Sequence, residues 1–197
     1  MKNRKKEIIH AAMKRFAKHG LNKTTLDEIA RDMRIGKATI YHYFTSKQEL
    51  YNESVTSEID LLIETIGSIF NKDEITLEER LNLFISTKFR LQHNFPLIFM
   101  LIKNNLNENR LDFERELLNV LFYKEVSIVR LFISAITKDI PDQKSIEFSK
   151  ILVMQSYNIS LMQEFDLLDE NSILEDRING YFYFFKRLFP VIENPVN

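Results

Sequence analysis

Residues 24 to 47, TTLDEIARDMRIGKATIYHYFTSK, constrain the fold more than any other segment of this 197-residue chain. Thr25 and Glu28 have the T-x-x-E spacing of a capping box, which satisfies free backbone amides at the start of a helix. Apolar residues then recur at helical spacing: Leu26, Ile29, Ala30 and Met33. Residues 33 to 36 leave room for a turn only, and Gly36 tolerates the dihedral angles of a helix N-cap. The segment therefore predicts two short helices joined by a tight turn.

The second of these helices begins at Lys37 and divides its side chains between two faces. Ile40 and Phe44 form an i, i+4 pair that points inward. Polar and aromatic side chains lie on a different face: Thr39, His42 and Tyr43. A helix of this kind, held across a partner helix by a short turn, is the unit that enters the major groove of DNA.

Three consecutive stretches, IIHAAMKRFAKHG, TTLDEIARDM and GKATIYHYFTSKQEL, extend this unit to residues 8 to 50. Together they resemble the DNA-binding domain of the TetR (tetracycline-repressor-like) family of bacterial transcription regulators. The chain departs from the family pattern at Gly36, where the family often has serine. It departs again at His42-Tyr43, where many members have Tyr-His, so the base preference cannot be predicted.

The resemblance implies two sets of DNA contacts. Phosphate contacts are expected from Thr25, from Tyr41 or Tyr43, and from Lys47. Base-edge contacts are expected from Lys37, Ala38, Thr39 and His42. Lysine can donate to O6 and N7 of guanine, and alanine or a threonine methyl group can touch the methyl group of thymine. Tyr41 can equally be a core residue, and Lys47 an ordinary solvated cation.

The charge of the chain is distributed unevenly. The formal net charge of −1 does not favour nucleic acid by itself. Residues 1 to 47, however, hold 12 Lys+Arg against 4 Asp+Glu, a balance of +8. The remaining 15 Lys+Arg against 24 Asp+Glu give −9 for residues 48 to 197. Such asymmetry predicts a basic binding surface at one end. The first residues, MKNRKK, form either an arm that reaches DNA or a flexible solubilising tail.

The rest of the chain is predicted to be helical throughout. Three further capping boxes precede apolar series of helical period: Ser46/Glu49, Thr76/Glu79 and Ser172/Glu175. Further helices are expected from Pro96 to about residue 103, over 111 to 136 and over 146 to 165. The predicted fold is all-α, with about nine helices. A three-helix helix-turn-helix DNA-binding domain (1–48) is followed by a helical ligand-binding and dimerisation domain (49–197).

Dimerisation and effector binding are implied by the resemblance. The last helix carries more apolar surface than one buried stripe requires, which places the dimer contacts at Tyr181, Phe182, Phe185 and Phe189. A pocket among the middle helices is expected to use Phe89, His93, Tyr123, Tyr157 and Asn158. These residues can equally be ordinary core. Neither the inducer nor the regulated genes can be predicted from the sequence.

Enzymatic motifs are missing from the sequence. Cysteine is absent, the four histidines form no zinc-binding spacing, and no phosphate-cradling glycine loop or nucleophile elbow occurs. No apolar run is long enough to span a bilayer. We therefore expect a cytoplasmic, ligand-responsive dimeric regulator without cofactor, metal or catalytic activity, which binds a palindromic operator and is released by an inducer. Repression is favoured over activation. The alternative is a helical adaptor for protein contacts without specific DNA binding.

Overall fold

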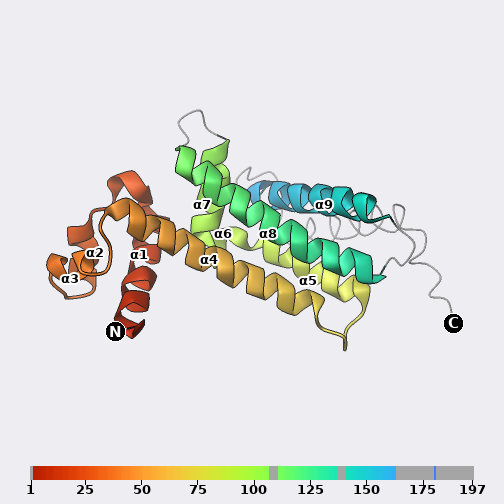
Figure 1. Cartoon of the computed structure of the whole chain (residues 1–197), viewed down its shortest axis with the longest axis horizontal. Helices are drawn as coiled ribbons and strands as arrows, with labels where there is room; N and C mark the ends of the chain where they lie inside the picture. The colour runs from red at the N-terminus through yellow and green to blue at the C-terminus, as the bar shows by residue number, and fades with distance from the viewer. Residues whose placement is uncertain (1, 107–110, 137–140, 163–179, 181–197) are drawn as a thin grey trace. The chain divides into compact units, whose positions relative to one another are not determined.

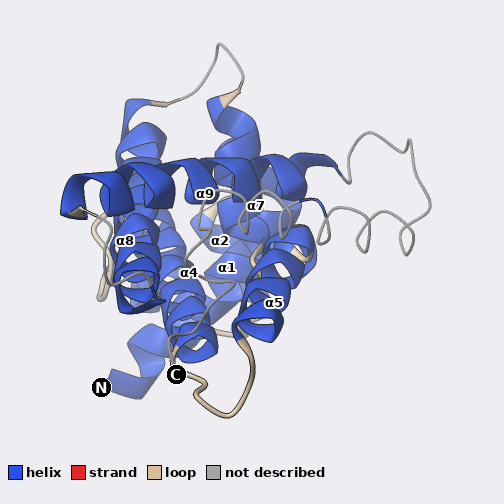
Figure 2. Ribbon diagram, turned by 90° about the vertical axis from the view of Figure 1, so that its right-hand side faces the viewer, coloured by secondary structure: helices blue, strands red, loops and turns tan. Residues whose placement is uncertain are grey.

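The structure, a computed structural model, describes residues 2–106, 111–136, 141–162 and 180. All regular elements in these ranges are helices, as Figure 2 shows, and strands are absent from them. The helices are α1 (Lys2–Lys23), α2 (Leu26–Asp32), α3 (Lys37–Tyr41), α4 (Lys47–Phe70), α5 (Leu77–Phe89), α6 (Leu91–Asn94), α7 (Pro96–Asn105), α8 (Asp112–Ile136) and α9 (Asp142–Met162). The prediction of an all-α fold is confirmed. In the described part of the chain, no helix is sufficiently long and apolar to cross a membrane.

The helices differ from the predicted set in three places. The short helix α6 was not predicted, and the helix expected from Ser172 lies outside the described residues. Helix α9 begins at Asp142, directly after Pro141, which is earlier than expected. Residues 2 to 6 are not a flexible tail, because they belong to the first turns of α1. There the ammonium group of Lys5 lies 2.7 Å from a carboxylate oxygen of Glu53 on α4. A contact of residues 2 to 6 with DNA stays a prediction.

The chain forms two compact units. Unit 1 comprises residues 1–62 and 95–118, and unit 2 comprises residues 63–94 and 119–197. The boundaries fall within α4 and α8 and between α6 and α7, so the chain passes directly from α6 into unit 1 at Phe95. The functional boundary expected after residue 48 remains a prediction. In packing terms, most of α4 and all of α7 belong with α1, α2 and α3.

Tyr51 of α4 is the centre of the core of unit 1. Its fully buried ring makes an edge-to-face contact with Phe16 of α1, at 5.1 Å between ring centroids. A second edge contact, at 6.0 Å, joins it to Phe113 of α8. Its hydroxyl group donates to Glu114 Oε1 at 2.9 Å, so the one polar atom of the ring is satisfied inside the core. Tyr51 therefore holds α1, α4 and α8 together.

Glu58 of α4 caps helix α7 from outside that helix. The N-cap residue of α7, Phe95, has no side-chain hydrogen bond to offer, and Pro96 at N1 has no N–H. The first free amides are those of Leu97 and Ile98. Such amides normally donate hydrogen bonds to the side chain of the N-cap residue. Glu58 accepts both, with Glu58 Oε2 2.8 Å from the Ile98 nitrogen. Burial raises the pKa of Glu58 to about 7, although the two amides lower it.

Unit 2 is built on aromatic and aliphatic packing between helices. The ring of Phe70, at the end of α4, stacks on Phe132 of α8 at 4.2 Å and contacts Phe84 of α5 at 5.4 Å. Helix α5 also packs against α9. Thr76 and Glu79 form the predicted capping box at the start of α5, with both reciprocal hydrogen bonds present.

The raised pKa of Glu58 predicts a pH-dependent stability. The folded state binds the Glu58 proton more tightly than the unfolded state does, whose pKa is near 4.5. The contribution of this group is therefore greatest below pH 4.5 and is lost as the pH rises through 7. Glu58→Gln removes the buried charge and keeps an acceptor. We expect Glu58→Gln to gain stability relative to the wild type as the pH rises. The difference between its free energy of unfolding and that of the wild type should be about 2–3 kcal/mol larger at pH 8 than at pH 5.

Urea unfolding followed by circular dichroism at both pH values measures this difference. Glu64→Gln, at an exposed position of the same helix, is the matched control and should change stability little. A Glu58→Gln variant whose stability follows that of the wild type from pH 5 to pH 8 would contradict a buried, proton-binding carboxylate.

Candidate nucleic-acid interface

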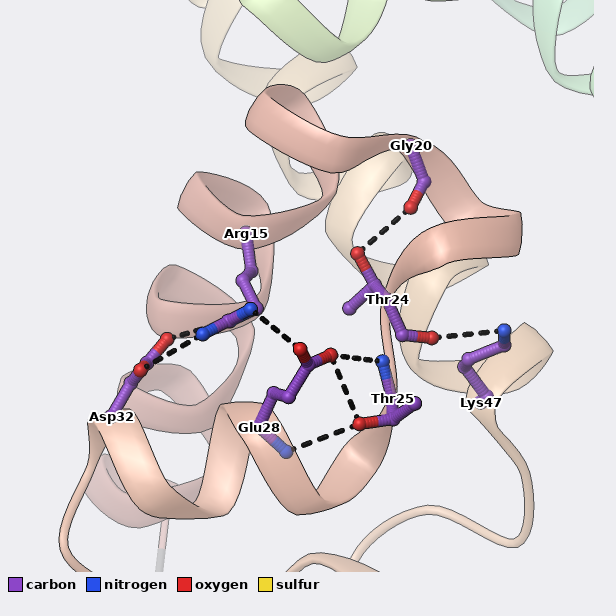
Figure 3. Close-up of polar contacts among 7 residues, drawn as sticks. All are labelled: Arg15, Gly20, Thr24, Thr25, Glu28, Asp32 and Lys47. Carbon is purple, nitrogen blue, oxygen red and sulfur yellow. Dashed lines mark hydrogen bonds and ion pairs between the residues drawn. The ribbon is translucent and has the colours of Figure 1, made fainter.

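Helix α2 begins where the sequence predicted. The Thr25 side chain accepts the Glu28 amide at 3.3 Å, and the Glu28 carboxylate accepts the Thr25 amide at 2.9 Å. This is the expected capping box. The Thr25 hydroxyl also donates to Glu28 Oε2 at 3.0 Å (Figure 3). These hydrogen bonds lower the pKa of Glu28, with the backbone bond to Thr25 as the largest cause. The Thr25 hydroxyl is therefore engaged in the protein itself.

Arg15 attaches α1 to α2. Figure 3 shows its guanidinium group between two carboxylates of α2. It donates to Asp32 at 2.8 and 3.2 Å and lies 3.2 Å from Glu28. A planar guanidinium group can bind a carboxylate through two parallel hydrogen bonds, which fixes the orientation of the partner helix. The angle between α1 and α2 is set in part by this contact. This contact between distant residues is not predictable from the sequence pattern.

The turn between α2 and α3 contains a residue in a left-handed conformation. Arg34 has φ 54°, a region that side chains rarely adopt. The next amide, that of Ile35, donates to the carbonyl group of Ala30 at 3.0 Å and closes the turn. The sequence gives no signal for this conformation, since glycine is the usual residue there. Gly36 serves instead as the N-cap of α3, as predicted, with φ −73° and ψ 143°.

The predicted recognition residues, on α3 and directly after it, are exposed or half-buried. Ile40, and Phe44 shortly after the helix, are fully buried, as expected. Exposed positions are Lys37, Ala38, Tyr41 and His42, whereas Thr39 and Tyr43 are half-buried. Tyr41 is 51% exposed, so the alternative that it is a core residue is wrong. Figure 1 shows α2 and α3 beside α1, the arrangement of a helix-turn-helix unit.

Lys37 is held by an acidic residue of the neighbouring helix. Its ammonium group lies 2.6 Å from Asp27 Oδ2 and 5.9 Å from the centroid of the Tyr41 ring. The hydrogen bond to Asp27 raises the pKa of Lys37. Both partners are about half exposed, so the pair is solvated and can exchange. To read a base, Lys37 must leave Asp27, and the pair keeps the side chain near the start of α3 until then.

Lys47 stabilises the C-terminal end of α1. Its ammonium group donates to the carbonyl groups of Leu21 and Thr24, at 2.8 and 2.9 Å. Cations are favoured at this end of a helix, where carbonyl groups lack partners. Figure 3 shows the Lys47 contact beside that of Thr24, whose buried hydroxyl donates to the Gly20 carbonyl at 2.8 Å. An ammonium group has three donors, so one remains for a phosphate oxygen. The phosphate contact itself stays a prediction.

The start of α4 differs slightly from the predicted capping box. Ser46 accepts the Glu49 amide at 3.0 Å, as expected. The Glu49 carboxylate, however, binds the amide and the hydroxyl group of Thr45, at 2.5 and 2.6 Å. The hydrogen bonds to Thr45 lower the pKa of Glu49. The last two residues of the loop between α3 and α4, Thr45 and Ser46, are therefore both bound to Glu49.

The predicted effector-binding residues are distributed unevenly between surface and interior. His93 and Asn158 are exposed, Tyr123 is 60% exposed and Phe89 is half-buried. Tyr157 of α9 is the exception, because its hydroxyl group is buried. The predicted dimerisation residues, Tyr181, Phe182, Phe185 and Phe189, lie outside the described residues. The roles of both sets stay predictions.

Tyr157 belongs to a buried charged cluster that the sequence analysis missed. Lys88 of α5 and Glu125 of α8 form an ion pair, and both side chains are completely buried. The Lys88 ammonium group lies 4.5 Å from the centroid of the Tyr157 ring. Burial lowers the pKa of Lys88, while Glu125 opposes this effect. Nothing distinguishes these residues from surface charges in the sequence, because their burial depends on how α5, α8 and α9 pack.

The fold and the interface together define a helix-turn-helix DNA-binding protein. Residues 8–53 match the family model described as bacterial regulatory proteins of the tetR family. The N-terminal part of the chain therefore matches the DNA-binding domain of the TetR family.

A similar curated protein is the HTH-type negative transcriptional regulator of the biofilm operon icaADBC, IcaR, from Staphylococcus aureus. It is 29% identical over 104 residues, which cover 53% of this chain and 56% of that regulator. The chain thus matches only about half the length of this relative.

Solved structures share the fold over most of the chain. The transcriptional regulator FadR from Bacillus subtilis, in complex with stearoyl-CoA, is 18% identical, with a TM-score of 0.65 over 87% of this chain and 94% of that chain. A TetR transcriptional regulator from Legionella pneumophila is 16% identical, with a TM-score of 0.68 over 88% and 94%. At these identities the likeness concerns the fold alone.

The two capping boxes allow the structural and DNA-binding roles of Thr25 to be separated. Thr25→Ala and Thr76→Ala each remove the same reciprocal box, one in unit 1 and one in unit 2. We expect each to lower the free energy of unfolding by about 1 kcal/mol. Only Thr25→Ala should also weaken DNA binding, as measured by fluorescence anisotropy on a labelled duplex. Equal DNA affinity for the two variants would remove Thr25 from the interface.

Proposed function

We propose that this chain is a dimeric transcription regulator, with repression favoured, that binds a palindromic operator through α3 and is released by a small molecule. The exposed face of α3 carries the proposal. Its polar and aromatic side chains point outward from a helix-turn-helix unit within a segment of charge +8. Phosphate contacts supply affinity and base-edge contacts supply specificity, and this segment holds residues suited to both.

Dimerisation follows from the size of the DNA site. One helix-turn-helix unit reads only a few base pairs, and a two-fold dimer doubles the site. Two copies of α3 would then lie about 34 Å apart, which is one turn of DNA. Repression is favoured because IcaR is named a negative regulator. A protein with this role works where bacterial DNA lies, in the cytoplasm.

The buried cluster in unit 2 supports effector binding at Tyr157. A completely buried ion pair contributes little net stability, because removing both charges from water opposes their attraction. Buried ionisable groups of this kind occur frequently at functional sites. Of the five predicted effector residues, Tyr157 adjoins such a pair. An effector that binds there would shift the population of operator-binding states by its difference in affinity.

DNA binding is tested by a salt titration on duplexes from the region immediately upstream of the gene itself. We expect tight binding to one palindromic segment. Lys37→Ala and Thr39→Ala should weaken that binding by about tenfold and relax the sequence preference. Lys47→Ala should weaken binding to all sequences and reduce the salt slope by about 1. Lys72→Ala, an exposed lysine in unit 2, is the control. Absence of binding at low salt would overturn the proposal in favour of the adaptor.

The effector site is tested by comparing two tyrosine variants. Compounds that release the duplex from the wild type are first found by anisotropy and then titrated against Tyr157→Phe and Tyr123→Phe. Each variant loses one hydroxyl group, and only the first lies at the buried cluster. We expect Tyr157→Phe alone to need about tenfold more compound, since a polar group of the site is lost. Equal responses of both variants would place the effector site elsewhere.

A further inference from the structure

Glu58 connects α4 and α7 of unit 1 through hydrogen bonds from helix amides to a buried carboxylate. It takes the place of an N-cap for α7 although it lies on α4, 40 residues earlier than its partner Ile98. A local cap would satisfy α7 whether or not α4 were present. Here the first free amides of α7 have their acceptor only while α7 lies on α4, so the capping of one helix depends on its packing against another.

The position of this cap in the chain gives it a direct link to unit 2. Helix α6, the last element of that stretch of unit 2, ends at Asn94. Only Phe95 separates it from α7, and the amides that Glu58 accepts are in the first turn of α7. A displacement of α6 is therefore transmitted by covalent bonds to the atoms that Glu58 holds.

The other end of the connection is the DNA-binding unit. Seven residues before Glu58, Tyr51 packs on Phe16 of α1, and the first residue of α4, Lys47, holds the end of α1. Helix α1 in turn binds α2 through Arg15 and also contacts α7. Within unit 1, a continuous set of contacts therefore leads from α7 through α4 to the helix-turn-helix.

We propose that Glu58 makes the α4–α7 contact a switch: α7 stays on α4 while its first amides are bound to Glu58, and their release accompanies loss of the operator. The proposal rests on the proposed function as a DNA-binding regulator. The packed arrangement is the operator-binding state, because it fixes α4 against α1. Separation of α7 from α4 would return Glu58 to water and remove one of the contacts that fix α4 within unit 1.

A buried carboxylate suits a switch because the cost of keeping it away from water favours separation of α7 from α4. No lysine, arginine or histidine among the described residues pairs with Glu58. Tyr51, on the same helix, interacts electrostatically with Glu58, and its hydroxyl group binds Glu114 of α8. Helix α7 offers only Lys103, exposed near its far end, and the ionisable side chains of α1 from Arg4 onward are exposed or half-buried. Two amides compensate the charge of Glu58 only in part, and opening of the α4–α7 contact restores its hydration.

Hydrogen–deuterium exchange of single amides, followed by NMR, tests the contact in the free protein. The Leu97 and Ile98 amides report on the bond to Glu58, and the Phe99 amide, bonded to the Phe95 carbonyl at 3.0 Å, reports on α7 itself. Wild type and Glu58→Gln are compared at equal pH, with Glu64→Gln as the control. At each pH, the exchange rate of the Ile98 amide in the wild type is divided by its rate in Glu58→Gln. We expect this ratio of rates to rise about tenfold to a hundredfold between pH 5 and pH 8. A constant ratio would overturn the switch.

The same measurement with a bound duplex tests the link to DNA. Coupling is reciprocal, so an operator that favours the packed state must slow the opening of α7. We expect DNA to slow exchange at Leu97 and Ile98 in the wild type by about fivefold or more, together with amides of α3. If DNA slows amide exchange in α2 and α3 but not at Leu97 and Ile98, Glu58 is a structural cap only. That result would overturn the switch and leave the proposed DNA-binding function intact. If no amide slows and no duplex binds at low salt, the proposed function fails as well.

Discussion

The packing of Tyr51 determines how the other parts of unit 1 are arranged. Its ring contacts α1 and α8, and its hydroxyl group binds Glu114, so one side chain of α4 positions three helices. Because α2 and α3 are attached to α1, the orientation of the recognition helix also depends on this contact. An aromatic side chain suits this position, since it buries a large apolar area and still carries one polar atom for a directed hydrogen bond.

The DNA-binding face and the structural support of the helix-turn-helix share several residues. Thr25, Lys37 and Lys47 were expected to contact DNA, and each has a protein partner in the structure. In a DNA complex, Thr25 and Lys47 would lose less conformational freedom than free side chains, whereas Lys37 would first have to leave Asp27. Asp27 keeps the Lys37 ammonium group near the start of α3.

Both units contain buried charged groups, but the partners that compensate the charge differ. In unit 2, Glu125 and Lys88 neutralise each other in the core, beside a tyrosine. In unit 1, the partners of Glu58 among the described residues are helix amides, which are partial charges and leave it poorly compensated. The first arrangement resists opening, because separating the pair would leave two uncompensated charges. The second opens more easily, and it lies where the chain passes from α6 to α7.

The sequence by itself determined the local structure, because capping boxes, prolines and apolar periodicity act over a few residues. The starts of α2 and α5, the inward positions of Ile40 and Phe44 and the all-helical fold were all predicted from such patterns. Only the tertiary structure decided the long-range contacts: Arg15 on α2, Lys47 at the end of α1, Glu58 at α7 and the buried Lys88–Glu125 pair. A charged residue looks the same in a sequence whether it is solvated or buried. The environment that decides this comes from helices far apart in the chain, and so does the function of the residue.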